Sequence, residues 1–173
     1  LSNDISGIKS QQDPSRQQIY YSYNFSYVHL SVLNFPYGFH SEFTSTQLEW
    51  IQQDLRNSQI YPFKIVIFHC PIFSSGFYGG NPNMLQLHHI FQENNVSIVF
   101  SGHDHHYERI LKDGIQYMVI GTGGAIQDLH EIVVKDSQKI AIGPSFVEGF
   151  SNSTHLELTV YHVGGYIIDS ITI

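Results

Sequence analysis

Two short segments of the sequence place histidines where they could bind a metal ion. Residues 101–109 read Ser-Gly-His-Asp-His-His-Tyr-Glu-Arg, so that His103 and His105 stand two positions apart, and His69 lies upstream of them. Imidazole is a common neutral metal ligand, and side chains two positions apart in extended backbone can point to the same side. The pattern therefore indicates a metal site that uses these three histidines.

Each histidine segment follows a run of apolar, largely β-branched residues. Residues 65–68 precede His69, and residues 96–100 precede the second segment. Both runs have the length and composition of buried strands. Ligands and metals bind at the carboxyl edge of the strands in an open α/β sheet. We therefore expect the two segments to meet at one edge of a sheet.

The same two segments resemble a known family. Ile-Val-Ile-Phe-His-Cys-Pro at 65–71, followed by Ser-Gly-His-Asp-His-His-Tyr-Glu-Arg at 101–109, is similar to two motifs of the calcineurin-like metallophosphoesterases. The Gly-His-x-His-x-Tyr-Glu-Arg form resembles the purple acid phosphatase branch. The resemblance implies an α/β (α+β) fold, a β-sandwich flanked by helices.

The resemblance covers only the C-terminal motifs of that family. The earlier motifs (Asp-x-His, Gly-Asp with a nearby Tyr, and Gly-Asn-His) do not occur in this sequence. We therefore expect residues 1–173 to be the C-terminal part of a single metallophosphoesterase catalytic domain, without its N-terminal strand–helix units. The expected partner is that N-terminal half, in the same chain or in another.

The resemblance also implies a reaction and a metal centre. A dinuclear centre of iron with zinc, manganese or a second iron would activate water for in-line attack on a phosphomonoester. His69 and His103 would bind one ion and His105 the other, and His106 would be catalytic by donating a proton or hydrogen bond to phosphate. Plant relatives carry a His-His pair in the Gly-rich loop that here spans 74–81, and this sequence lacks it.

The number of ligands limits what the chain can do alone. Three histidines cannot hold two ions, and the bridging carboxylate would come from the motifs that this sequence lacks. We therefore predict that the isolated chain of 173 residues has little phosphatase activity. Two tightly bound metals per chain and full turnover of a simple phosphomonoester would contradict this prediction.

Three other functions remain open on the sequence alone. One is a phosphodiesterase of the same superfamily. Another is a catalytically inactive fragment that serves as a binding or scaffold module. The last is a mononuclear zinc-binding module whose ligands are His69, His103 and His105.

Composition excludes some classes of partner. The formal charge of −7, with only eight Lys and Arg residues, argues against a nucleic-acid binder. No apolar stretch is long enough for a membrane helix, and Cys70, as the only cysteine, allows no internal disulfide. N-glycosylation sequons begin at Asn24, Asn95 and Asn152, which favours a secreted, lysosomal or vacuolar location.

Local patterns predict the remaining elements. We expect a hairpin from residues 19–24 and 27–33, a tight turn at 112–115, and a terminal hairpin from 155–161 and 166–173. Residues 1–18 and 125–150 show little pattern and are expected to be irregular.

Two helices are predicted between these strands. The first begins among residues 44–46, with a capping box at Thr46 and Glu49, and ends near Asn57. The second begins at Asn81 and Pro82.

Several polar residues are expected to have structural roles. We assign His29, His88 and His89 to packing or to solvated surfaces, and expect His130 to be exposed. Asp104 and Glu108 are expected to orient neighbouring groups, and Arg109 to form a structural ion pair.

Overall fold

A computed structural model describes residues 9–13, 18–35, 43–125 and 133–173 of the chain. Two α-helices lie in these ranges, α1 (Ser45–Asn57) and α2 (Leu85–Glu93), and the 3₁₀ turn η1 (Pro82–Met84) leads into the second. The strands of the described residues are, in chain order, β1 (Lys9–Asp13), β2 (Gln18–Phe25), β3 (Val28–Val32), β4 (Phe63–Ile67), β5 (Ile98–Ser101), β6 (Tyr107–Lys112), β7 (Ile115–Ile120), β8 (Ser137–Ala141), β9 (Ser145–Ser151), β10 (Leu156–His162) and β11 (Ile167–Thr172).

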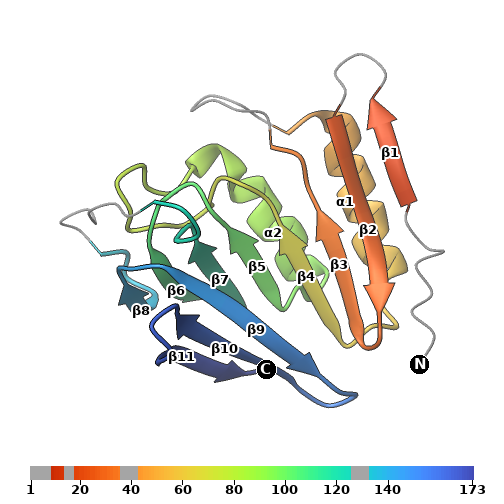
Figure 1. Cartoon of the computed structure of the whole chain (residues 1–173). Coiled ribbons are helices and arrows are strands. Elements are labelled where there is room, and N and C mark those ends of the chain that lie inside the picture. The colour runs from red at the N-terminus through yellow and green to blue at the C-terminus, as the bar shows by residue number, and fades with distance from the viewer. Residues whose placement is uncertain (1–8, 14–17, 36–42, 126–132) are drawn as a thin grey trace.

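The strands form two sheets that face each other. The larger sheet has the order β1-β2-β3-β4-β5-β7-β6-β8, and the smaller one the order β11-β10-β9. Strands β3, β4, β5 and β7 run parallel, and the outer strands are antiparallel to their neighbours. Both helices cover one face of the larger sheet, and the smaller sheet packs on the other face (Figure 1). This arrangement confirms the expected α/β sandwich flanked by helices.

Two hydrophobic cores hold these three layers together. The core between helices and sheet includes Ile51, Leu87 and Phe91, which are completely buried. The core between the two sheets includes Ile98 and Met118, also completely buried. Strands β4 and β5 have apolar layers on both faces, which explains why their sequences are mostly apolar and do not alternate with polar residues.

Helix α1 begins within the predicted range 44–46, but its N-cap lies two residues before the predicted capping box. Thr44 is the N-cap, and its hydroxyl accepts a hydrogen bond from the backbone N–H of Gln47 at 3.2 Å. The prediction of a box at Thr46 and Glu49 is therefore wrong. The buried Gln47 amide instead bonds the backbone of Asn34, with its Oε1 accepting at 2.9 Å and its Nε2 donating at 2.8 Å. This pair fixes the helix start to the segment that follows β3.

The three predicted hairpins or turns are confirmed. Strands β2 and β3 pair antiparallel, as do β6 with β7 and β10 with β11. The turn between β6 and β7 has φ of 48° at Asp113 and 84° at Gly114. Positive φ at both central residues is the requirement of a type I′ hairpin turn, which Asp-Gly satisfies.

The expectation of irregular structure at 1–18 and 125–150 is wrong in part. Strand β1 falls in the first range, and strands β8 and β9 fall in the second. All three are outermost strands of their sheets. An edge strand has a neighbour on one side only and needs little apolar patterning, which explains why these three strands have no clear pattern in the sequence. Residues 126–132, which include His130, lie outside the described residues.

Candidate metal centre

Strands β4 and β5 bring the two histidine segments to the same edge of the sheet. They pair in parallel, and their backbones stay hydrogen-bonded beyond the strand ends. Phe68 N–H donates to the carbonyl of Phe100 at 3.2 Å, and Gly102 N–H donates to the carbonyl of His69 at 2.8 Å. The segments therefore meet at the carboxyl ends of parallel strands, as the sequence predicts.

His69 and His103 come together at this edge. Their ring centroids are 5.2 Å apart, with the planes at 71°. His103 has φ of 66°, a left-handed conformation that costs energy for a residue with a side chain. Burial, with His69 beside it, lowers the pKa of His103, and Asp104 opposes that shift. A lowered pKa favours the neutral ring, the form that binds metals.

Cys70 lies close to these two histidines, which the sequence pattern did not predict. The possible ligand atoms of His69, Cys70 and His103 all lie within 4.8 Å of one another. His105 is half-buried and stands outside this group in the described part of the chain. The structure thus brings together two of the three predicted ligands, and the metal role of all three stays a prediction.

His106 lies in the interior rather than at the exposed edge. Only 1% of His106 is exposed, and its Nε2 lies 3.1 Å from Oε2 of the buried Glu108. His103 and His105 are half-buried, whereas Asp104 and His106 are buried. The motif therefore alternates between the site and the interior. The catalytic role of His106 stays a prediction.

The two carboxylates of the motif fasten the loop that follows β4. Asp104 accepts from Ser74 Oγ at 2.5 Å and from Tyr78 N–H at 2.9 Å. Glu108 accepts from the N–H and the hydroxyl of Ser75 at 2.7 and 2.6 Å, and from Ser137 Oγ at 2.6 Å. The expectation that Asp104 and Glu108 orient their neighbours is confirmed.

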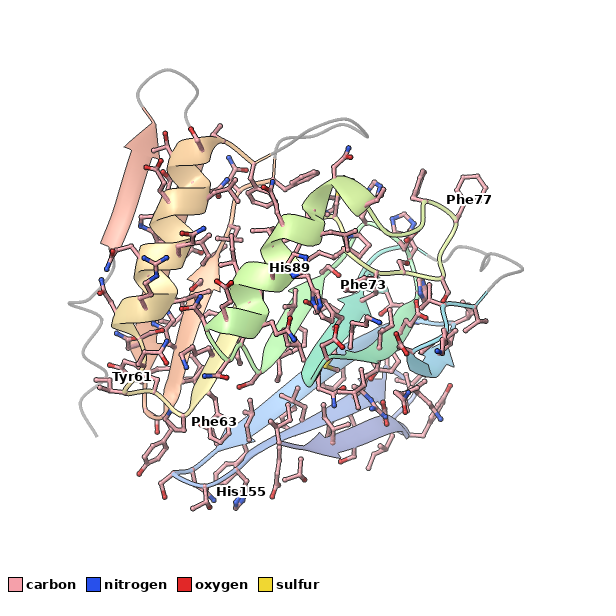
Figure 2. The ribbon with its side chains drawn as sticks, turned by 180° about the vertical axis from the view of Figure 1, so that it is seen from behind. Tyr61, Phe63, Phe73, Phe77, His89 and His155 are labelled. Carbon is pink, nitrogen blue, oxygen red and sulfur yellow. The ribbon has the colours of Figure 1, made fainter. Side chains whose placement is uncertain are left out.

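The fastened loop places two aromatic rings at the edge of the site. The ring of Tyr78 lies 4.5 Å from that of His103, tilted by 35°, and Phe77 meets Tyr78 edge-on at 5.2 Å. Phe77 is 61% exposed and projects outward from the loop (Figure 2). The sequence placed a Gly-rich loop at this edge without indicating which side chains would face the histidines.

The remaining described histidines that we assigned to packing are indeed elsewhere. His29 is buried and bonds Asp54 at 2.9 Å and Asn24 at 2.6 Å. His88 is buried, while His89 is exposed on the outer face of α2 (Figure 2). The assignments of all three are confirmed.

Arg109 forms the structural ion pair that we expected. Its Nε donates to Asp169 Oδ2 at 2.7 Å, and the hydroxyl of Tyr107 donates to the same oxygen at 2.8 Å. The pair joins β6 of the larger sheet to β11 of the smaller one. Arg109 therefore links the two sheets of the sandwich.

Comparison with known proteins agrees with this arrangement. The family model of the calcineurin-like phosphoesterases matches residues 7–107. Purple acid phosphatase 21 of Arabidopsis thaliana is 33% identical over 125 residues, covering 64% of this chain and 28% of its own length. Purple acid phosphatase 5 of the same plant is 27% identical over 154 residues, covering 72% of this chain and 39% of its own.

Solved structures show the same fold. Purple acid phosphatase PPD1 from yellow lupin seeds superposes with a TM-score of 0.82 at 22% identity, over 93% of this chain and 33% of that one. GAP50, described as the anchor in the inner membrane complex of Plasmodium, superposes with a TM-score of 0.73 at 16% identity, over 96% of this chain and 52% of that one.

The chain thus spans about a third of the length of the plant relatives that it matches. The family model covers more than half of the chain, and both motif segments begin or lie within the matched range. These matches, together with the sandwich and the paired histidines at its edge, lead to one assignment. The chain belongs to the calcineurin-like phosphoesterase family, and its relatives there are purple acid phosphatases.

Proposed function

We propose that residues 1–173 are the C-terminal part of the catalytic domain of a metal-dependent phosphatase that hydrolyses phosphomonoesters. The observation that carries this proposal is the distance of 5.2 Å between the ring centroids of His69 and His103, which follow adjacent parallel strands. Family membership supports it, because calcineurin-like phosphoesterases and purple acid phosphatases imply a dinuclear metal centre.

The donors on this chain fit one ion of that centre. His69 and His103 would hold the first ion, and His105, two residues further along the same loop, would contribute to the second. We propose iron with zinc, manganese or a second iron as the metals. When bound, the ions supply Lewis-acid activation of water and neutralise charge on the phosphoryl group. The remaining ligands, including the bridging carboxylate, would come from the N-terminal half of the domain.

His106 remains our proposed proton or hydrogen-bond donor, and its surroundings define how it could act. Because Nε2 faces the carboxylate of Glu108 at 3.1 Å and would carry its proton there, Nδ1 could donate to a phosphate only when the ring is doubly protonated. Glu108 is itself fixed by Ser75 and Ser137, so it would hold the imidazole in one orientation.

Two apolar grooves support the proposal that more polypeptide covers this structure. A groove of about 330 Å³ lies beside His69, and apolar side chains such as Val32, Ile67 and Ile120 line it. A second groove, of about 540 Å³, opens between the two sheets and is lined by Phe146 among others. Apolar grooves of this kind are typical of surfaces that bind another segment, another chain or a ligand.

An inactive scaffold is the second candidate function. The structural neighbour GAP50 is described as an anchor in its own complex. A chain that lacks the bridging carboxylate could keep the fold and bind partners without turnover. Substrate hydrolysis separates the two functions.

The proposed location is outside the cytoplasm, in the secretory route or the vacuole. Two of the sequon residues, Asn24 and Asn95, are exposed in the structure, which supports this proposal. Among the described residues, no helix is long and apolar enough to cross a membrane.

Hydrolysis assays on a polypeptide that carries the N-terminal half in addition to residues 1–173 test the proposed phosphatase. We expect p-nitrophenyl phosphate to be cleaved faster than bis-p-nitrophenyl phosphate. We also expect His69→Ala and His103→Ala each to lower kcat/KM by about 100-fold or more, since loss of even an outer-shell partner costs 10–100-fold.

His89→Ala is the matched control, because His89 is exposed on α2 and should leave the rate unchanged. A preference for the diester would favour the phosphodiesterase alternative. Absence of turnover with both metals bound would favour the scaffold. Unchanged activity in His103→Ala would refute the proposed centre.

A further inference from the structure

We infer that Phe77 and Tyr78 form an aromatic subsite that binds the alcohol side of the substrate. The inference rests on the proposed function, because the phosphate would lie at the edge where His69 and His103 meet. It adds a substrate class to that function: phosphomonoesters of phenols, in which an aromatic ring is bonded directly to the ester oxygen.

A closed turn presents the two aromatic rings. Gly79 N–H donates to the carbonyl of Gly76 at 3.1 Å, so Phe77 and Tyr78 are the two central residues of a β-turn. The turn is also fastened to the motif, because Tyr78 N–H donates to Oδ1 of Asp104 at 2.9 Å. A turn that is already fixed loses little conformational freedom when a ligand binds to it.

The two rings continue outward from the histidine pair. The ring of Tyr78 lies 4.5 Å from that of His103, and Phe77 meets Tyr78 edge-on at 5.2 Å. Phe77 is therefore one ring further from His103, and it projects outward from the loop (Figure 2). Because Tyr78 lies directly against His103, little length remains for a sugar between the phosphate and the aromatic group. This favours an aryl ester over a nucleotide.

Both rings have exposed surface that a ligand can cover. A single exposed aromatic residue is ordinary on a protein surface. Here two exposed rings pack on each other, and one of them packs on a histidine of the proposed centre. Edge-to-face and offset-stacked contacts with a third ring are favourable beyond the area that they bury. An aryl ester supplies such a ring, whereas an aliphatic ester does not.

The competing explanation is that Phe77 packs against the polypeptide that the proposed function places upstream of this chain. In that case replacement of Phe77 would weaken the assembly of the two halves. All substrates would then be affected equally, whatever their alcohol.

A matched pair of substrates distinguishes these explanations. Phenyl phosphate is compared with cyclohexyl phosphate on the metal-loaded polypeptide that carries the N-terminal half and residues 1–173. Phe77→Ala should raise KM for phenyl phosphate by about 3- to 10-fold and leave kcat unchanged. KM for cyclohexyl phosphate should not change. Phe77→Trp should keep the low KM, whereas Phe77→Leu, which is apolar but not aromatic, should behave like Phe77→Ala.

Tyr27→Ala is the matched control. Tyr27 is also an exposed aromatic residue, but it precedes β3, at the opposite end of the parallel strands from His69. It should leave KM for both esters unchanged. Equal effects of Phe77→Ala on the two esters, or no effect on phenyl phosphate, would overturn the inference and leave the phosphatase standing. An effect seen only with AMP, relative to ribose 5-phosphate, would also overturn it.

Binding of phosphonates, which are not hydrolysed, gives a readout that needs no turnover. Calorimetric titration should show that Phe77→Ala binds phenylphosphonate about 3- to 10-fold more weakly than the unaltered polypeptide does. Both should bind methylphosphonate equally. If this difference is found while no ester is hydrolysed, the phosphatase proposal fails and the aromatic subsite stands. If the unaltered polypeptide and Phe77→Ala bind phenylphosphonate equally, the subsite is overturned, whatever the rate of hydrolysis.

Discussion

At the residue scale, the motif at 101–109 has side chains that face the edge of the sheet and others that face the interior. His103 lies beside His69 at the carboxyl edge of the larger sheet, while Asp104 and Glu108 face inward and fasten the loop after β4. Glu108 shows how strongly the inner side is held, since it is completely buried and accepts from Ser75 and Ser137. Its role is therefore structural.

Glu108→Gln should destabilise the protein by about 2–4 kcal/mol. The amide presents an NH₂ group to donors that the carboxylate now accepts from, and leaves them unsatisfied in the interior. Urea unfolding at pH 7 measures this loss. Glu93→Gln, at an exposed position on α2, is the control and should change stability by less than about 0.5 kcal/mol. Equal stabilities of the two variants would contradict the role given to Glu108.

At acid pH, the unaltered protein should lose its greater stability relative to the Glu108→Gln variant. Burial alone would raise the pKa of Glu108, but hydrogen bonds from His106, Ser137 and Ser75 outweigh it and lower the pKa from the ordinary 4.5. A carboxyl group whose pKa is lowered by folding stabilises the protein at pH values above its unfolded-state pKa. This stability is lost as the pH falls through the folded-state pKa. The difference in unfolding free energy between the unaltered protein and Glu108→Gln should therefore shrink below pH 4.5. A constant difference from pH 7 to the acid limit would contradict this account.

The sequence predicted the paired histidines but not their neighbours. His69 and His103 follow apolar strands, and parallel strands end at one edge, so their approach could be expected. Cys70 and Tyr78 carry no such signal. The approach of Tyr78 to His103 depends on the hydrogen bonds that the loop donates to Asp104, between two segments that are distant in the sequence.

At the element scale, the segment between β4 and η1 packs closely on Asp104, and Gly76 is the residue that makes this close contact possible. A Cβ on Gly76 would overlap the Cγ of Asp104 and lie 2.6 Å from its Cβ. Since real Cβ atoms do not approach side-chain atoms so closely, any larger residue at 76 must push the loop away from Asp104.

Gly76→Ala should therefore lower the unfolding free energy by about 1–3 kcal/mol through overpacking. Gly123→Ala is the matched control, because it lies at an exposed position where a Cβ would meet nothing within 4 Å. Denaturant unfolding of both variants measures the effect. If Gly76→Ala proves as stable as Gly123→Ala, the loop is not packed on Asp104 as described.

The elements that the sequence predicted well are those that bury apolar faces in a core. Strands β4 and β5 and both helices bury apolar faces, and their patterns were readable. The start of α1 among residues 44–46 was predicted correctly, but the capping box at Thr46 and Glu49 was not, because Thr44 is the N-cap and Gln47 bonds the segment after β3. Strands β1, β8 and β9 were missed because sheet edges need no such pattern.

At the scale of the whole molecule, the chain forms a layered fold with surfaces suited to further polypeptide. The smaller sheet packs over the larger one, yet Phe150 on its edge strand β9 remains 61% exposed. The sequence predicted the sandwich through family resemblance, whereas composition and periodicity alone gave only strands and helices. The grooves beside His69 and between the sheets arise from the way the sheets meet, which no local pattern encodes.

The central claim is that His69 and His103 share one metal ion at the carboxyl edge of the larger sheet. Anomalous diffraction at the zinc edge, from crystals grown with Zn²⁺, tests it most directly. We predict an anomalous peak within about 2.0–2.2 Å of one nitrogen of each ring. Zinc bound elsewhere, with no ion between these two rings, would contradict the account.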